Sequence, residues 1–186
     1  MNRKWLAIIG VLFLAAGCGG SGEAGDFVLL ADPTGGTSEL AYPNGHPILF
    51  RSTDRDVLSR EAELTDLIQN YRVSLGLDAL VLDPEMSLLA RAHSHHMGQH
   101  RFFDHPNPEG DLACDRAIRA DVAWTGFGEN IATGQETSDE VFADWLASDT
   151  HRRVIEDSDW THVGTGYSWN PSSLGGHLWT TNFKRN

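Results

Sequence analysis

The chain has 186 residues, a net charge of −12 from 26 acidic and 14 basic side chains, and 40% hydrophobic residues. This length suits one globular domain with an additional N-terminal segment, and the apolar content is ordinary for a folded protein. The negative charge repels phosphate backbones and anionic headgroups, so the composition argues against nucleic acid as a partner.

The first residues have the features of a secretory leader. Asn2–Lys4 is a short basic start, and the apolar run Trp5–Ala16 is too short for a stable transmembrane span. Ala15-Ala-Gly-Cys18 then resembles a lipobox, with alanine where leucine is usual three residues before the cysteine. We therefore predict a lipoprotein signal peptide over residues 1–17 and lipidation of Cys18, which would tether the protein to a membrane without spanning it. A plain signal peptide followed by an incidental cysteine is the alternative.

Residues 18–56 are predicted to form the lipidated tether, with a partly ordered end. The turn-forming strings "GGSGEAGD", "DPTGG" and "YPNGHP" dominate this segment, and "DFVLLA" and "HPILFR" are compatible with short strands. Lipidation of Cys18 would leave Cys114 as the remaining cysteine of the two in the chain. Cys114 is therefore expected to pack as a small hydrophobe and to form no internal disulfide.

Helical spacing begins after Val57 and marks the start of the folded domain, residues 57–186. A first helix is predicted to end near Gly76, and a second to begin at Asp83, which suits the N-cap, followed by Pro84 in the first turn. Further helices are expected around 115–120 and after the capping box Thr137-Ser-Asp-Glu140.

The last third of the chain is typical of strands. "WTHVGTGYSWN" and "GGHLWTTNF" flank a Pro-Ser-Ser turn, and Phe127–Ile131 is compatible with a further short strand. Helices followed by antiparallel strands indicate an α+β layer fold.

Five histidines lie within the stretch "HSHHMGQHRFFDH". His93 falls on the apolar stripe of the second helix, which favours a buried core histidine over a ligand. His96 and His100 share a helical face, but Met97 stands where the hydrolytic "HExxH" arrangement needs glutamate, so both are expected on the surface. His105 leaves the helix on a loop braced by aromatic residues and proline, and it is the candidate functional histidine.

An ordered series of motifs follows, including "IQNYR", "LGLDALVLDPEM", "ARAHSHHM", "FFDHPNPEG", Asp115-Arg116, "GENIATG", "VFADWLASDTHRRVI" and "HVGTGY". From about residue 60 to 183 the chain resembles the bacterial branch of the CAP or SCP superfamily, which includes cysteine-rich secretory proteins, antigen 5 and pathogenesis-related proteins. The resemblance implies an α-β-α sandwich in which a small antiparallel sheet lies between helices.

The resemblance also implies a cleft lined by two histidines and two acidic residues that can hold a divalent metal, often zinc. By position, His105 and His151 correspond to the histidines and Glu129 of "GEN" to the first acid. The second acid falls near Ser148, and this departure lowers the expected metal occupancy; Asn130 is a further candidate for the cleft. Three ligands would leave a fourth zinc position for water. In the alternative interpretation, Glu129 bridges both histidines in a metal-independent polar cluster.

Three functions remain open at this point. The first is a membrane-anchored, extracytoplasmic binding protein that takes up a small or lipidic ligand, with a weakly held divalent ion or none, and that has no catalytic residue. The second is a metal-assisted hydrolase of peptide or cell-envelope bonds, in which Glu129 acts as ligand or base. A serine-hydrolase variant using Ser148 is disfavoured because no "GxSxG" elbow is present in the sequence. The third is a structural or adhesive envelope protein with a vestigial cleft.

Overall fold

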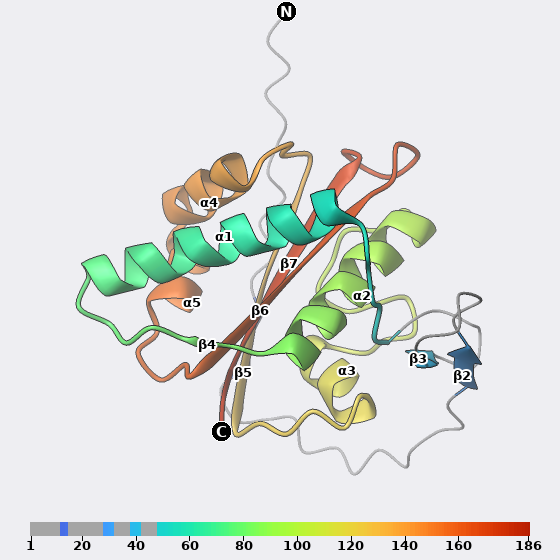
Figure 1. Ribbon diagram of the computed structural model, residues 1–186, viewed down its shortest axis with the longest axis horizontal. Helices are drawn as coiled ribbons and strands as arrows, with labels where there is room; N and C mark the ends of the chain where they lie inside the picture. The colour runs from blue at the N-terminus through green and yellow to red at the C-terminus, as the bar shows by residue number, and fades with distance from the viewer. Residues whose placement is uncertain (1–11, 15–27, 32–37, 42–47) are drawn as a thin grey trace, which may run out of the picture.

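The computed structural model describes residues 12–14, 28–31, 38–41 and 48–186 (Figure 1). Within these ranges the elements, in chain order, are β1 (Leu12–Leu14), β2 (Val28–Ala31), β3 (Ser38–Ala41), α1 (Arg55–Ser74), β4 (Val81–Leu82), α2 (Pro84–His100), α3 (Ala113–Arg119), β5 (Gly126–Thr133), α4 (Ser138–Ala147), α5 (Asp149–Glu156), β6 (His162–Trp169) and β7 (His177–Arg185).

The central sheet has the strand order β1-β5-β7-β6-β4, and β2 pairs with β3 separately. Strand β7 runs antiparallel to both β5 and β6, whereas the two-residue β4 is parallel to β6. Figure 1 shows α1, α4 and α5 grouped together and α2 and α3 grouped on the opposite side of the long strands. The predicted α+β class and the α-β-α sandwich are therefore confirmed.

Hydrophobic cores lie on both faces of the sheet, because successive strand side chains point in opposite directions; a smaller third cluster is formed by Met97, Ile131 and Leu178. The core beneath α1, α4 and α5 contains Leu64, Ile68, Val141, Trp145, Val154, Ile155, Val163, Trp179 and Phe183. The core beneath α2 and α3 contains Met86, Leu89, Ala113, Cys114, Ala117 and Phe127. The sheet is thus buried on both sides, and polar side chains on its strands are removed from water.

The predicted helix starts are confirmed where a side chain satisfies the exposed backbone N–H groups. The Asp83 carboxylate accepts hydrogen bonds from the backbone N–H groups of Glu85 and Met86 at 2.9 and 3.2 Å, and Pro84 occupies the first turn of α2. Thr137 and Glu140 form the capping box of α4. These local signals fix where the helices begin before any tertiary contact forms.

Several elements differ from the sequence prediction. Helix α5 and strand β4 were not predicted, because both are short and gain their stability from packing and from pairing with β6. Strand β2 lies within "DFVLLA", but the described part of "HPILFR", from Ile48 onward, forms no strand. Strand β1 falls inside the predicted leader and pairs with β5, so removal of residues 1–17 would leave β5 at the sheet edge. The proposed boundaries at residues 17 and 18 lie outside the described residues.

Cys114 is fully buried in the core beneath α2 and α3, as predicted for a small hydrophobe. The expectation that it forms no disulfide is wrong, because Cys114 is disulfide-bonded. The sequence contains two cysteines, and the other one, Cys18, lies outside the described residues. An intramolecular disulfide would use the sulfur that a thioether-linked lipid requires, so the two modifications are alternatives.

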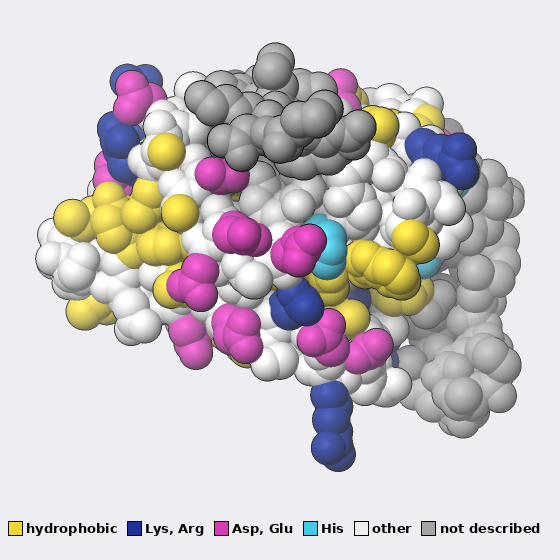
Figure 2. Space-filling view, turned by 90° about the horizontal axis from the view of Figure 1, so that it is seen from above, with side chains coloured by type: hydrophobic (Ala, Val, Ile, Leu, Met, Phe, Trp, Pro, Cys, Tyr) yellow, Lys and Arg dark blue, Asp and Glu magenta, His cyan; other side chains and the backbone are white. Residues whose placement is uncertain are grey.

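The molecular surface reflects the acidic composition. In the view of Figure 2, acidic side chains gather near the centre of the face, and hydrophobic side chains form separate patches. Within the described residues, no helix combines the length and the apolar character needed to cross a bilayer.

Helix α2 lies directly on the backbone of β6, and glycine makes this approach possible. A Cβ atom at Gly166 would overlap the backbone of Ala90 and Arg91, and one at Gly164 would overlap that of Met86 and Ser87. The hydroxyl of Ser94 donates to the carbonyl of Gly166 at 3.0 Å across the same contact. Helix α2 carries the loop that holds His105, so this packing also sets the position of the candidate site.

We expect Gly166→Ala to lower the free energy of unfolding by about 3 kcal/mol or more, because backbone atoms cannot yield to the added methyl group. Gly126→Ala is the matched control, since a Cβ there meets only the side chain of Arg185, which is 41% exposed. Urea denaturation of both variants measures the difference. Equal losses of stability would contradict the proposed close packing.

Candidate functional site

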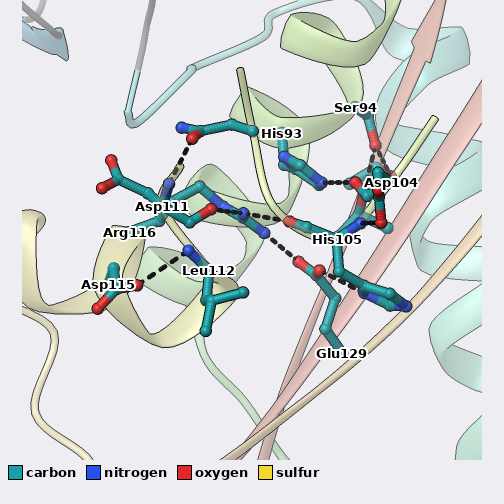
Figure 3. A network of polar contacts seen from close by, with 12 residues as sticks. His93, Ser94, Asp104, His105, Asp111, Leu112, Asp115, Arg116 and Glu129 are labelled. Carbon is teal, nitrogen blue, oxygen red and sulfur yellow. Dashed lines mark hydrogen bonds and ion pairs between the residues drawn. The ribbon is translucent and has the colours of Figure 1, made fainter. Parts of the chain in front are cut away.

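A buried polar cluster joins the loop after α2 to α3 and β5 (Figure 3). The Nδ1 atom of His105 lies 2.9 Å from Oε1 of Glu129, and Arg116 donates to Oε2 of Glu129 at 2.5 Å. The exposed fractions of these three side chains are 4%, 2% and 3%. The histidine, the carboxylate and the guanidinium therefore interact in a volume that excludes water.

The backbone around His105 is fixed by several hydrogen bonds. The N–H of His105 donates to the Asp104 carboxylate at 2.8 Å, and Arg116 donates to the His105 carbonyl at 2.7 Å. Arg116 also contacts the carbonyl of Asp111 at 3.2 Å, at the far end of the same loop. One guanidinium thus closes the loop and holds the Glu129 carboxylate.

His93 lies behind this cluster and is 1% exposed. Its Nε2 atom is 3.0 Å from the carbonyl of Asp104, which places α2 under the loop. The predicted assignment of His93 as a core histidine is confirmed. The predicted surface position of His96 is wrong, because His96 is also 1% exposed, whereas His100 is exposed as expected.

The charges in the cluster shift its titration strongly. Burial by itself raises the pKa of Glu129, but Arg116, His93 and the hydrogen bond from His105 together lower it to about 2. Burial, reinforced by the positive charge of Arg116, lowers the pKa of His93 to about 3. The carboxylate is therefore ionised and the His93 imidazole neutral at neutral pH.

His151 approaches the cluster from α5. Asn130, the neighbour of Glu129 on β5, donates from Nδ2 to the His151 carbonyl at 3.1 Å. Burial, followed by the charge of His105, lowers the pKa of His151 to about 4. His105 thus bonds Glu129 directly, whereas Asn130 contacts only the backbone of His151, and the imidazole of His151 lies close enough to His105 for its charge to act on it.

A hollow of about 240 Å³ opens beside His151. Its walls include Phe103, Ile131, Ala132, Trp145 and Ala147, with Ser148 and Asp144 as polar members. The His151 ring is stacked on Trp145 at a centroid distance of 6.3 Å. Within the described part of the chain, Nε2 of His151 is buried and has no hydrogen-bond partner. A mostly apolar hollow thus contains one imidazole nitrogen able to bind a polar group.

Ser148 lies at the rim of this hollow, between α4 and α5. Its hydroxyl is 3.0 Å from the hydroxyl of Thr150. It occupies the position where the resemblance implies a second acid, and a hydroxyl supplies no negative charge to hold a dication. Ser148 therefore contributes polarity to the hollow and no charge.

The fit of a metal ion depends on Glu129. Both of its oxygens are already engaged, one by His105 and the other by Arg116. Across residues 48–186, no group of three or more histidine, cysteine or acidic side chains has the arrangement of a metal site. This geometry suits a carboxylate that orients a histidine through Nδ1, as carboxylates behind metal-binding histidines do, and not one that binds a metal directly.

The role of Arg116 does not follow from the sequence motif Asp115-Arg116 by itself. An arginine among the apolar residues Ala113, Cys114 and Ala117 was the signal, because a buried guanidinium needs a carboxylate partner.

We expect Glu129→Gln to destabilise the protein by about 3–5 kcal/mol, because the Arg116 guanidinium would remain buried without a counter-charge. Arg116→Met should be similarly costly, since burial would then raise the pKa of Glu129. The double variant should recover part of the loss. A double-mutant cycle by chemical denaturation measures the coupling, and additive losses would contradict the ion pair.

Acid should destabilise the fold in the pH range where the histidines of the unfolded chain bind protons and the buried histidines of the native protein do not. The pKa values of His93 and His151 lie near 3 and 4, below the ordinary value of 6.5. The free energy of unfolding should therefore fall as pH drops from 6.5 toward 4, by about 1.4 kcal/mol per pH unit for each histidine.

The measurement is urea denaturation between pH 7 and pH 4.5. His93→Gln, which retains a donor for the Asp104 carbonyl, should show a shallower dependence on pH than the parent protein, and His100→Gln serves as the exposed control. An unchanged slope in His93→Gln would contradict the assignment.

Comparisons with known proteins place this chain in a family. Residues 65–183 match the family described as CAP, the cysteine-rich secretory protein family. The uncharacterized protein YkwD of Bacillus subtilis strain 168 is 33% identical over 132 residues, which are 71% of this chain and 49% of that protein. The uncharacterized membrane protein YlbC of the same strain is 32% identical over 106 residues, 57% of this chain and 31% of that protein. The chain thus spans half or less of these curated relatives.

Solved structures share the fold. An extracellular protein containing an SCP domain from Bacillus anthracis superposes with a TM-score of 0.64 at 25% identity, covering 73% of this chain and 45% of that one. An outer surface protein from Borrelia burgdorferi gives a TM-score of 0.61 at 21% identity, covering 66% of this chain and 90% of that one. The match over residues 65–183, the identity to YkwD and the shared sandwich show that the chain belongs to the CAP family of cysteine-rich secretory proteins.

Proposed function

We propose that this CAP-domain protein works outside the cytoplasm as a binding protein, and that the hollow beside His151 takes up a small, largely apolar or lipidic ligand. The observation that carries the proposal is the buried Nε2 atom of His151, which has no hydrogen-bond partner within residues 48–186 and belongs to a side chain lining the hollow. A buried polar atom of this kind is stabilised when a ligand supplies the missing hydrogen bond.

The chemistry of the hollow favours a particular kind of ligand. Most of its wall is apolar, so a hydrocarbon group gains free energy on binding. The low pKa of His151 keeps its imidazole neutral, so it can exchange a hydrogen bond with a hydroxyl or ester group. Asp144 disfavours an anionic headgroup. A monoacylglycerol combines an acyl chain with hydroxyl and ester groups and is a suitable probe.

A divalent metal is a second occupant that the same residues could hold. His105 and His151 would be its ligands, and Glu129 would orient His105. Zinc accepts imidazole nitrogen, but two imidazoles without a directly bound carboxylate form a weak site. Zinc, when bound, would supply a Lewis acid next to the hollow. We therefore propose low zinc affinity that weakens further below about pH 6.

Isothermal titration of the purified protein with short-chain monoacylglycerols and with zinc tests both proposals. His151→Ala should weaken monoacylglycerol binding at least tenfold, and His105→Ala together with His151→Ala should abolish any zinc signal. His162→Ala, outside the cluster, is the control. Heat changes that persist unaltered in the His151→Ala protein would refute the assigned hollow.

A metal-assisted hydrolase of peptide or cell-envelope bonds is the alternative function. It is supported by the ionised Glu129 carboxylate in contact with His105, but the engagement of Glu129 with Arg116 disfavours Glu129 as a general base. Incubation with casein and with peptidoglycan, with and without zinc, decides between the functions. Turnover that is lost in Glu129→Ala while the variant remains folded would establish the hydrolase.

Location outside the cytoplasm is supported by two relatives, one described as an extracellular protein and one as a membrane protein. We propose that the membrane link is a lipid on Cys18, because "LAAGC" resembles a lipobox. Expression in a bacterial host should yield a membrane-bound protein whose N-terminal peptide carries diacylglycerol on Cys18. Cys18→Ser should release the protein, and Cys114→Ser should not.

Mass spectrometry of the unreduced protein separates the two chemistries of Cys18. A thioether-linked lipid at this position supports the anchor and would mean that the disulfide of Cys114 is not made with Cys18 of the same chain. A peptide pair joined through Cys18 and Cys114 would instead refute lipidation.

A further inference from the structure

A second, larger hollow lies apart from the His105 and His151 cluster and shares no lining residue with the hollow beside His151. Its volume is about 440 Å³, within the roughly 300–1,000 Å³ typical of small-molecule sites. It lies between the start of α1, the middle of α2 and the ends of β6 and β7. The side chains that matter for its chemistry are Ser52, Asp54, Arg60, Tyr167, Trp169 and His177.

The inner wall is rigid and aromatic. Tyr167 is 3% exposed, its hydroxyl lies 2.8 Å from Nδ1 of His177, and its ring packs on Trp179 at a centroid distance of 4.4 Å. The Arg60 guanidinium lies 5.2 Å from the centre of the Tyr167 ring. Arg60 is itself held by Asp56 at 2.7 Å and by the carbonyl of Glu136. The polar groups of this wall are therefore preorganised before any ligand arrives.

Trp169 forms an aromatic platform at the mouth. It is the last residue of β6, it is paired with His177 of β7, and it is 59% exposed. Among the described large hydrophobic side chains, its exposed fraction is as high as that of any in the fold. An exposed indole held at the end of a paired strand can stack on a flat, partly apolar ligand at little conformational cost.

The lining carries balanced charge. Asp54, Asp56, Arg60 and Arg91 line it; Arg60 is paired with Asp56, and Arg91 is paired with Glu61 at 2.5 Å. An anion would be repelled by the two carboxylates and a cation by the two guanidinium groups, so the lining favours neither sign of charge. A neutral molecule with many hydroxyl groups can instead donate to the carboxylates and accept from the guanidinium and the serine hydroxyls.

We propose that this second hollow binds a neutral saccharide, with one sugar face stacked on Trp169 and its hydroxyl groups bonded to Asp54, Arg60 and Ser52. Sugar rings present an apolar C–H face and an equatorial belt of hydroxyl groups. An exposed indole beside alternating donors and acceptors matches both features. The site is independent of the proposed ligand hollow beside His151.

The test is binding of neutral tetrasaccharides, namely chitotetraose, cellotetraose, maltotetraose and mannotetraose, to the whole protein by isothermal titration and by quenching of tryptophan fluorescence. At least one should bind with a Kd of millimolar or lower. Trp169→Ala should weaken that binding at least tenfold, and Trp169→Phe should restore much of it, because both substitutions lie at an exposed position and only the second retains an aromatic face.

Leu174→Ala is the matched control, since Leu174 is 54% exposed on the same hairpin and does not line the hollow. This variant and His151→Ala should bind the saccharide like the parent protein, and Trp169→Ala should leave monoacylglycerol binding unchanged. Failure of all four tetrasaccharides to bind, or equal binding by Trp169→Ala, would overturn the proposal. Binding of choline or of lysine peptides that is lost in Trp169→Ala, without any saccharide binding, would likewise overturn the proposal in favour of a cation site.

Discussion

The Glu129 carboxylate is the constraint on which the candidate site depends. It is buried in the middle of a sheet that is covered on both faces, where an ionised group without partners would cost several kcal/mol. Arg116 from α3 and His105 from the loop after α2 compensate this cost together. Three elements that are separate in the sequence are therefore held in one place by the need to satisfy one charge.

This arrangement changes what a CAP-family cleft can do in this chain. The guanidinium neutralises the carboxylate that would otherwise attract a dication, and Ser148 stands where a further acid is implied by the resemblance. His105 and His151 then face a site with little net negative charge. We proposed an uncharged ligand for the apolar hollow beside His151 on this physical basis, with metal held only weakly.

The close packing of α2 on β6 connects the two candidate sites mechanically. Gly164 and Gly166 let the helix backbone approach the sheet. The C-terminal end of α2 leads into the loop of His105, and its central Arg91 contributes to the second hollow with Trp169. Because α2 helps to shape both hollows, substitutions at Gly164 or Gly166 should affect both of them. Substitutions at Trp169 or His151 should each affect one hollow only.

The sequence by itself determined the local features of this protein. The caps at Asp83 and Thr137 and the strand patterns near the C-terminus predicted the helix starts and the α+β class, because capping and periodicity are encoded within a few neighbouring residues. The ordered motifs indicated the family and its sandwich. Tertiary structure alone decided that Arg116 reaches Glu129, that His96 is buried, and that α5 and β4 form at all. It also decided that Trp169 is exposed beside Arg60 while Trp179 is buried. These outcomes depend on which side chains, far apart in the sequence, are buried next to one another. Local sequence patterns do not specify the distances between such side chains in the folded protein.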